Sequence, residues 1–320
     1  MTNSFFGLKR AGLAVVPPSA HQLAKGAAFV DRIEQVRALR AGETAKAVAP
    51  TPETTPAAKP ERFTDPKPLE ATDVLSPASV NQFVYDCQAK WMYKRVFGYP
   101  DKPSAALALG KAVHSAVEAN YRQKIDTRED LPTEGVVAVF MDELTRELDG
   151  VELDKTESVA DLREAGEVMT KIYMEQCAPR IQPAALEVHV TGKIGDVPVQ
   201  GFIDLLDVDG NIIDLKTKKQ KPSGIDPGYR LQVSTYAMLE PRSNGRARLD
   251  TMTKTKTVGW YPQTLEIGAS DRKHAERLYS ITRDQMQAGV FIPNRGSHLC
   301  SRKYCAYADR CVEDYGGSVK

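Results

Sequence analysis

The chain has 320 residues, of which 42% are hydrophobic and 27% charged, and its formal net charge at pH 7 is +1. This length can bury a sizeable core, and the composition is ordinary for a globular protein. With a net charge this close to zero, the protein as a whole does not attract anions. An anionic partner must therefore bind at a local basic cleft. No apolar run approaches the roughly 18 residues that span a bilayer, and the start lacks the long apolar region of a secretory signal, so we expect a cytoplasmic protein without membrane contact.

The first part of the chain differs from the rest in composition. Residues 1–72 are rich in Pro and Ala, with Thr, Lys and Glu between them. Such a segment buries little apolar surface, which predicts a disordered arm. Residues 28–41 within it can form a short amphipathic helix, either as a docking site for a partner protein or as a marginal helix in a tail.

Helices are expected next along the chain. Ser76 and Pro77 are a helix start signal, because Ser caps the helix and Pro fits its first turn, and this helix is expected to run to about Val96. Apolar residues at helical spacing predict three further helices, near 104–125, 133–148 and 158–178.

The pattern then changes to the period of two that is typical of strands. Strands are expected at 185–194, 197–207 and 210–217, with hairpin turns between them. A helix near 228–240, a strand at about 252–262 and a helix near 270–288 follow. This order predicts an α/β core with a mixed central sheet flanked by helices, and an added N-terminal helical lobe.

One predicted strand carries an acidic and a basic side chain on the same face. Side chains alternate along a strand, so Asp214 and Lys216 point one way while Ile213 and Leu215 point the other. Taken alone, this pattern also fits a solvated strand edge with a salt bridge.

A second carboxylate is expected nearby. Asp204 lies in a mostly apolar strand, which is costly unless a cation or a donor compensates it. A hairpin would bring Asp204 close to Asp214, and a divalent cation would relieve the repulsion between the two carboxylates. Hard oxygen ligands of this kind suit Mg²⁺ or Mn²⁺.

Two helices carry polar residues spaced one turn apart. His114 and Glu118 share one face of their helix, as do Gln232 and Tyr236 of a later helix. A single helical His is more often a structural residue than a ligand, so these pairs are weak indications by themselves.

The C-terminal region concentrates cysteine. Cys300, Cys305 and Cys311 follow the spacing C-x₄-C-x₅-C, which indicates a metal or cluster site that needs a fourth thiolate. The odd total of five cysteines argues against a disulfide framework. Cys177 lies outside the pattern and is expected to be a small buried side chain.

Four short motifs occur in a characteristic order. They are Gly110-x-x-x-His114, Gly201-Phe-Ile-Asp204, Asp214-Leu-Lys216 and Gln232-x-x-x-Tyr236. This series resembles the signature of the RecB-like branch of the PD-(D/E)xK nuclease superfamily, a branch that includes nuclease domains of recombination helicases, CRISPR-associated adaptation nucleases and phage-type exonucleases. The resemblance covers residues 74–312 and implies a restriction-endonuclease-like fold and a metal-dependent deoxyribonuclease, expected to be an exonuclease or end-processing enzyme in recombination, repair, phage or CRISPR-related DNA metabolism.

The resemblance also implies residue roles. Asp204, Asp214 and His114 would bind the catalytic Mg²⁺ or Mn²⁺, with Glu118 and Glu187 as candidate additional ligands. The other roles fall to Lys216, which would orient the attacking water and stabilise transition-state charge, and to Gln232 and Tyr236, which would position Lys216 or a DNA phosphate.

The resemblance also implies which cysteine is the fourth ligand of the C-terminal site. It implies a 4Fe-4S cluster held by Cys87, Cys300, Cys305 and Cys311, although the family often separates the first two C-terminal cysteines by two residues rather than four. Zinc in the same four thiolates is the alternative. Either metal would clasp one nuclease domain at 73–315, leaving a short tail at 316–320.

The expected substrate is DNA, single-stranded or with free ends. Lys218, Lys219 and Lys221 directly follow the catalytic strand and would contact phosphates, or form a solvated loop. Lys254 and Lys256 alternate in the expected strand at 252–262 and would extend this basic track. The alternatives are a catalytically inactive nucleic-acid-binding subunit with the same fold and a zinc-stapled interaction protein, and a recombination, repair or adaptation protein is the partner expected for the N-terminal arm.

Overall fold

The computed structural model describes residues 74–154, 157–254 and 258–320. The arm expected at 1–72, its segment 28–41, and Lys256 lie outside the described residues. Within the described part, no helix combines the length and the apolar character needed to cross a membrane.

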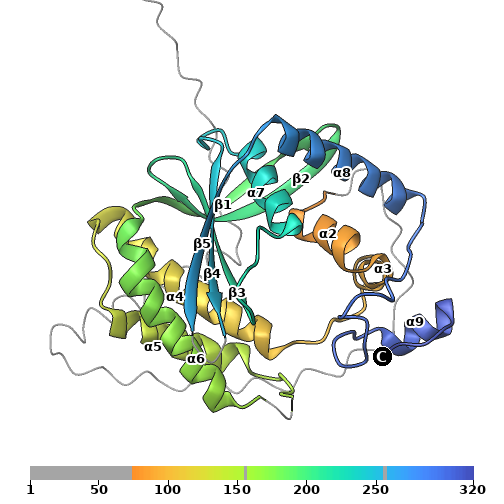
Figure 1. Ribbon diagram of the computed structural model, residues 1–320, viewed down its shortest axis with the longest axis horizontal. Coiled ribbons are helices and arrows are strands. Elements are labelled where there is room, and N and C mark those ends of the chain that lie inside the picture. The colour runs from red at the N-terminus through yellow and green to blue at the C-terminus, as the bar shows by residue number, and fades with distance from the viewer. Residues whose placement is uncertain (1–73, 155–156, 255–257) are drawn as a thin grey trace, which may run out of the picture. The chain divides into compact units, whose positions relative to one another are not determined.

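A five-stranded mixed sheet forms the centre of the fold (Figure 1). Its strands are β1 (Pro183–Ile194), β2 (Val197–Asp207), β3 (Ile212–Lys218), β4 (Arg246–Thr253) and β5 (Gly259–Glu266). They lie in sequence order, with β3 and β4 parallel and all other neighbours antiparallel. The predicted mixed sheet and its first three strands are therefore confirmed.

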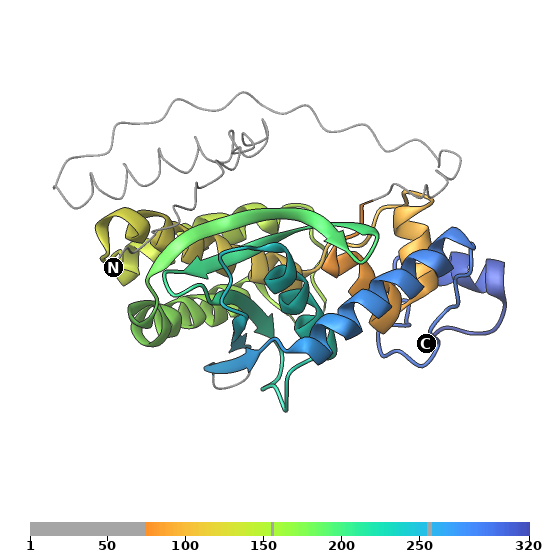
Figure 2. The same ribbon diagram turned by 90° about the horizontal axis from the view of Figure 1, so that it is seen from above.

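Helices cover both faces of this sheet. The helices of one side are α4 (Ala105–Thr127), α5 (Thr133–Glu147) and α6 (Val159–Ile172), and those of the other side are α7 (Pro227–Leu239) and α8 (Ala269–Gln287). Figure 2 shows the same layers from above, with the long β1–β2 hairpin, in green, arching over the upper side of the coloured ribbon. The restriction-endonuclease-like α/β class expected from the motifs is confirmed.

The first helical segment is not the single helix that was predicted. Ser76 begins α2 (Pro77–Asn81) as expected, and its hydroxyl accepts a hydrogen bond from Ser79 N at 3.2 Å. A π-helical turn follows, and then Cys87 adopts extended angles of φ −164° and ψ 121° before α3 (Gln88–Arg95) starts. The thiol of Cys87 caps α3 by accepting from Lys90 N at 3.5 Å.

The prediction of a single strand at 252–262 is also wrong. Two antiparallel strands, β4 and β5, occupy this part of the chain, and Lys254 lies just after β4 rather than within a strand. The prediction missed the alternation of polar and apolar residues over Arg246–Asp250, which begins β4 beside its parallel neighbour β3. Helix α6 likewise ends at Ile172, and a π turn and a 3₁₀ turn replace its expected last part.

The N-terminal and C-terminal segments of the described chain form one aromatic core. Trp91 stacks on Phe291 with ring centroids 5.9 Å apart, and Tyr93 packs against Tyr307 at 5.5 Å. The sequence prediction had omitted α9 (Ala308–Tyr315), whose Cys311 is buried in this cluster. The two ends of the described chain therefore pack together through side chains that are 200 or more residues apart.

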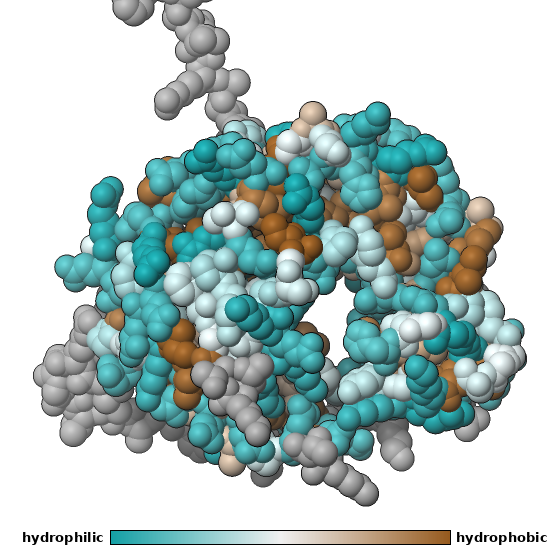
Figure 3. All heavy atoms as spheres, in the orientation of Figure 1, coloured by the Kyte–Doolittle hydropathy of each residue, from teal (hydrophilic) through white to brown (hydrophobic). Residues whose placement is uncertain are grey.

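The face of the molecule that is seen in Figure 1 is mainly hydrophilic. Figure 3, in the same orientation, also shows an opening through the described part of the chain. In the same orientation, Figure 1 places α4 and β3 at one border of the opening, with α2, α3 and the C-terminal segment at the other. Polar contacts link the two borders, since Lys102 Nζ donates to the carbonyl of Arg302 at 3.1 Å and Lys303 pairs with Asp154.

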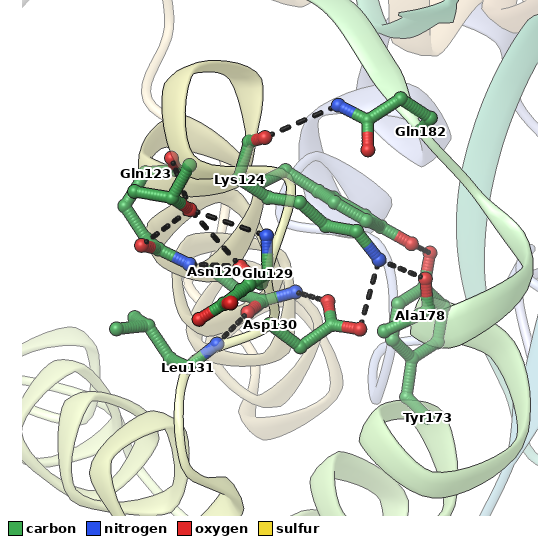
Figure 4. A network of polar contacts seen from close by, with 11 residues as sticks. Asn120, Gln123, Lys124, Glu129, Asp130, Leu131, Tyr173, Ala178 and Gln182 are labelled. Atoms are coloured by element: carbon green, nitrogen blue, oxygen red, sulfur yellow. Dashed lines mark hydrogen bonds and ion pairs between the residues drawn. The ribbon is translucent and has the colours of Figure 1, made fainter.

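A buried lysine fixes the end of α4 against the segment that leads into β1 (Figure 4). Lys124 is 4% exposed, and its Nζ donates to Asp130 Oδ2 at 2.8 Å and to the carbonyl of Ala178 at 2.7 Å. Asn120 Nδ2 donates to the other oxygen of Asp130 at 2.7 Å, and Gln182 Nε2 donates to the carbonyl of Lys124 at 3.1 Å. These contacts hold α4 in a defined position relative to the sheet.

We expect Lys124→Met to lower the free energy of unfolding by about 1–3 kcal/mol, because the Ala178 carbonyl and the Asp130 carboxylate lose their buried donor. Urea denaturation measures this change. Lys171→Met is the matched control, since Lys171 is exposed and pairs with Glu167 one turn away, and it should cause no measurable change. Equal stability of the Lys124 variant and the wild type would show that the buried contacts do not stabilise the fold.

Candidate active site

The point where β2 and β3 separate brings two carboxylates together. In the ladder between these strands, Leu205 pairs with Ile213 and Leu206 pairs with Ile212. Beyond them, Asp204 Oδ2 accepts a hydrogen bond from the backbone N of Leu215 at 3.2 Å. The Asp204 side chain thus takes over a hydrogen bond of the strand ladder and lies beside the segment that carries Asp214.

Asp214 is a buried carboxylate with two polar partners. It is 1% exposed, its Oδ1 accepts from Gln232 Nε2 at 3.0 Å, and Lys216 Nζ lies 2.6 Å from its Oδ2. Burial raises the pKa of Asp214, while the ammonium of Lys216 opposes that rise. Among the described residues, Oδ2 has no well-aligned hydrogen-bond donor, so one oxygen of this buried group depends on nearby positive charge.

Lys216 is charged despite its surroundings. Burial by itself would lower the pKa of this ammonium, but Asp214 and Asp204 outweigh burial and raise it. The ring of Tyr229 also lies below the ammonium, with Nζ 4.8 Å from the ring centroid. Sequence reasoning missed Tyr229, because no motif marks a ring that reaches back from the start of a helix to the preceding strand.

Two glycines of the sequence motifs permit close packing around this group. A Cβ on Gly201 would lie 2.6 Å from a ring carbon of Tyr236, and one on Gly110 would lie 2.9 Å from Thr217 Oγ1. Gly201 therefore lets α7 approach β2, so that the Tyr236 hydroxyl accepts a hydrogen bond from Gln232 Nε2 at 3.1 Å. Burial raises the pKa of Tyr236 to about 12, so its hydroxyl stays protonated near neutral pH.

The remaining candidate ligands line an adjoining cavity with about 340 Å³ of empty space. His114, Glu118, Glu187 and Asp204 all contribute to its wall, and His114 Nδ1 lies 3.5 Å from Asp204 Oδ2. His114 and Asp204 also act electrostatically on Asp214, so the cavity and the buried group are neighbours. The structure thus gathers the predicted residues into two adjoining groups, which share Asp204.

Glu187 has an unusual backbone. Its φ is +46°, in the left-handed region that residues other than glycine rarely adopt. Its neighbours Leu186 and Val188 pair with Leu205 and Ile203 of β2, which places Glu187 across from Asp204. Strained backbone of this kind concentrates at functional sites, and no sequence signal indicates it.

The lysines at the end of β3 and directly after it all have intramolecular partners. Lys218 lies 3.4 Å from Asp226 and 4.4 Å from the Tyr229 ring centroid. Lys221 lies over the ring of Tyr261 at 5.0 Å, and Lys219 is 3.9 Å from Glu157. These contacts hold the basic side chains near the end of the strand that carries Lys216.

The four predicted cluster ligands line a second cavity, far from the first along the chain. Cys87, Cys300, Cys305 and Cys311 surround about 460 Å³ of empty space, and all are free cysteines. Cys87 Sγ accepts from the backbone N of Asn294 at 3.3 Å, and burial raises the pKa values of Cys305 and Cys311.

Neither cavity is a ready-made metal site. Over residues 74–154, 157–254 and 258–320, no three His, Cys, Asp or Glu side chains are arranged as such a site. Cys177 is in the lining of neither cavity, although it interacts with Tyr173 of the cavity that contains His114. It is buried as expected, and its thiol also donates to Asp250 Oδ2 at 3.2 Å.

Comparisons with known proteins relate the sequence to one family. Residues 74–312 match the family model of the PD-(D/E)XK nuclease superfamily. No curated protein matches the sequence. A crystal structure named "Putative exonuclease" from Eubacterium rectale is similar, with a TM-score of 0.50, 16% sequence identity, and coverage of 75% of this chain and 88% of that one.

A second solved structure, of a protein named SSO0001, has a TM-score of 0.31 and 14% identity over 67% of this chain and 86% of that one. At these identities, the similarity to the Eubacterium rectale protein concerns the fold alone. The similarity to SSO0001 is too low to carry an argument.

We expect Gly201→Ala to lower the free energy of unfolding by about 1–3 kcal/mol, because the added methyl group overlaps the Tyr236 ring. Urea denaturation measures the effect. Gly224→Ala is the control, since a Cβ there meets nothing within 4 Å and should be neutral or slightly stabilising. If both variants unfold like the wild type, α7 does not pack against β2 as closely as described.

Proposed function

This chain belongs to the PD-(D/E)XK nuclease superfamily, and on that premise we propose that it is a metal-dependent deoxyribonuclease that acts at DNA ends. The observation that carries the proposal is the buried Asp214 carboxylate, paired with Lys216 and placed beside Asp204 and His114. A buried acid with an adjacent fixed ammonium is costly to maintain for stability alone, but it is useful where a charged phosphodiester reacts.

The donor set fits a divalent cation. Asp204 and Asp214 offer hard carboxylate oxygens, Asp214 Oδ2 lacks an aligned donor, and His114 lies next to Asp204. Oxygen-rich sites of this kind prefer Mg²⁺ or Mn²⁺. Glu187 and Glu118, which line the same cavity as Asp204, are the additional ligands that we propose. The bound ion would supply Lewis-acid polarisation of the phosphate and a more acidic water molecule.

The protein groups around the carboxylates have separate tasks in this proposal. Lys216 keeps its proton, so its ammonium stabilises negative charge that develops on the phosphate and orients the attacking water. Gln232 donates to both Asp214 and Tyr236, which fixes the carboxylate relative to α7. Tyr236 in turn restricts the orientation of Gln232.

Substrate binding in this proposal involves the lysines after β3. Lys218, Lys219 and Lys221 are close to Lys216 in sequence, and their acidic or aromatic partners hold them there, where a DNA phosphate could compete for the ammonium groups. Contacts with phosphates would position DNA without reading its sequence, and binding would weaken as salt rises. Recruitment by a recombination, repair or adaptation protein through residues 1–72 is a further part of the proposal.

We expect Asp214→Asn and Lys216→Met each to reduce Mg²⁺- or Mn²⁺-dependent DNA degradation at least about a hundredfold, because each removes a fixed charge at the reacting phosphate. The assay is digestion of DNA labelled at the 5′ or the 3′ end, with EDTA as the metal-free reference. Lys171→Met is the control for loss of a lysine outside the site. Full activity of either site variant would reject the assigned roles, and an inactive wild type would favour the non-catalytic binding subunit.

The cysteine cavity is the proposed site of a 4Fe-4S cluster, with zinc as the alternative. Support comes from the shared cavity of Cys87, Cys300, Cys305 and Cys311 and from the backbone N–H groups that point at the Cys87 sulfur. A metal there would connect the start of α3 with the C-terminal segment and stabilise the closed chain.

We expect anaerobically purified protein to be brown, to absorb broadly in the visible range, and to contain iron and sulfide. Cys305→Ser should lose the colour, because one of four thiolates is missing. Cys177→Ala should keep the colour, since Cys177 lies in a different part of the fold. Colourless wild-type protein with stoichiometric zinc would refute the cluster in favour of zinc.

A further inference from the structure

An aromatic pair lies exposed on the β1–β2 hairpin. His189 and Phe202 are cross-strand partners, and their rings stack with centroids 4.7 Å apart and an interplanar angle of 17°. Phe202 is 41% exposed, although most other aromatic side chains of the described residues are buried or half-buried. A large apolar ring that remains in water forgoes the stabilisation that burial would provide, and such exposed groups often mark binding surfaces.

The pair continues the face of the hairpin that carries the candidate active site. Phe202 precedes Asp204 by two residues and His189 follows Glu187 by two, so each aromatic ring shares a strand face with an active-site carboxylate. The intervening Ile203 is buried in the core beneath α7, on the opposite face. Two strand residues span about 6.6 Å, which corresponds to about two base steps of 3.4 Å along one strand of DNA.

We propose that His189 and Phe202 form the stacking surface for an unpaired base of the substrate, next to the phosphate that is cleaved. This inference rests on the proposed nuclease function. Base–aromatic stacking is favourable for every base and needs an accessible aromatic ring, and Phe202 is 41% exposed although its ring stacks on His189. A base inside a duplex has both faces occupied by its neighbours, so this surface selects a single-stranded end.

A role in hairpin stability alone does not explain the pair. Cross-strand aromatic pairs do stabilise antiparallel strands, but they do so wherever they occur along a hairpin. This pair is found directly beside Asp204 and Glu187, and the next pair on the same face is polar. Thr191 and Gln200 are exposed there, and Gln200 Oε1 lies 3.4 Å from His189 Nε2. On this face of the hairpin, the aromatic pair therefore lies next to the carboxylates, and the hydrogen-bonding pair lies farther from them.

The test measures affinity of the full chain for fluorescein-labelled single-stranded oligonucleotides by anisotropy, with Ca²⁺ and separately with EDTA. We expect Phe202→Leu to weaken binding about 5- to 150-fold, which corresponds to loss of one stacked base. Phe202→Trp should bind like the wild type, because it keeps an aromatic face. Val208→Ala is the matched control, since Val208 is 58% exposed in the turn after β2, and it should not change affinity.

A series of oligonucleotides with one abasic residue, moved step by step along the strand, identifies the stacked base. At one position, the abasic residue should weaken binding by the wild type by the same factor as the Phe202→Leu substitution does. At that position, the abasic residue should not weaken binding by the Phe202→Leu variant any further. Equal affinity of Phe202→Leu and wild type would overturn the inference. So would an equal response of both proteins to the abasic residue at every position, or absence of binding to any oligonucleotide.

Failure of the inference can be distinguished from failure of the proposed function. If the wild type binds with the expected abasic pattern but degrades no DNA with Mg²⁺ or Mn²⁺, the nuclease proposal fails and the stacking surface stands. If degradation depends on Asp214 while Phe202→Leu has an unchanged KM and affinity, only the stacking surface is refuted. Urea denaturation of Phe202→Leu separates a loss of affinity from a loss of folded protein.

Discussion

The burial of the Asp214 carboxylate is the constraint on which the rest of the site depends. A buried carboxylate is stable only with nearby positive charge and hydrogen-bond donors. Lys216 provides the charge from the same strand, and Gln232 provides a donor from α7. The position of α7 is set in turn by the absence of a side chain at Gly201, where Tyr236 packs against β2. One costly group thus specifies how a helix and two strands must meet.

A second constraint is closure of the chain around the sheet. The aromatic cluster of Trp91, Tyr93, Phe291 and Tyr307 joins the beginning and the end of the described chain. The cysteine cavity lies within the same lobe, with Tyr93 and Tyr307 also in its lining. Apolar packing therefore brings the thiols near one another, and a bound cluster or zinc ion would add stability to a closure that the aromatic residues already specify.

The differences from the expected elements have a common physical origin. The helix expected from Ser76 to Val96 is interrupted at Cys87, whose sulfur faces the C-terminal segment and accepts a hydrogen bond from Asn294. The strand expected at 252–262 is two strands, because β4 pairs in parallel with β3 on one side and antiparallel with β5 on the other. In each case, a partner distant in sequence determines the local structure, and propensity within a short window does not include that partner.

The sequence by itself determined the mixed sheet with its first three strands, and the candidate residues Asp204, Asp214 and Lys216, because strand alternation and motif order are local properties. Only the tertiary structure decided that Glu187 stands in a left-handed conformation across from Asp204, and that Tyr229 reaches Lys216. The stacking of His189 on Phe202 also depends on the register of β1 against β2. Registers and helix approaches arise from packing between residues that are far apart in the chain, so no pattern within a single segment encodes them.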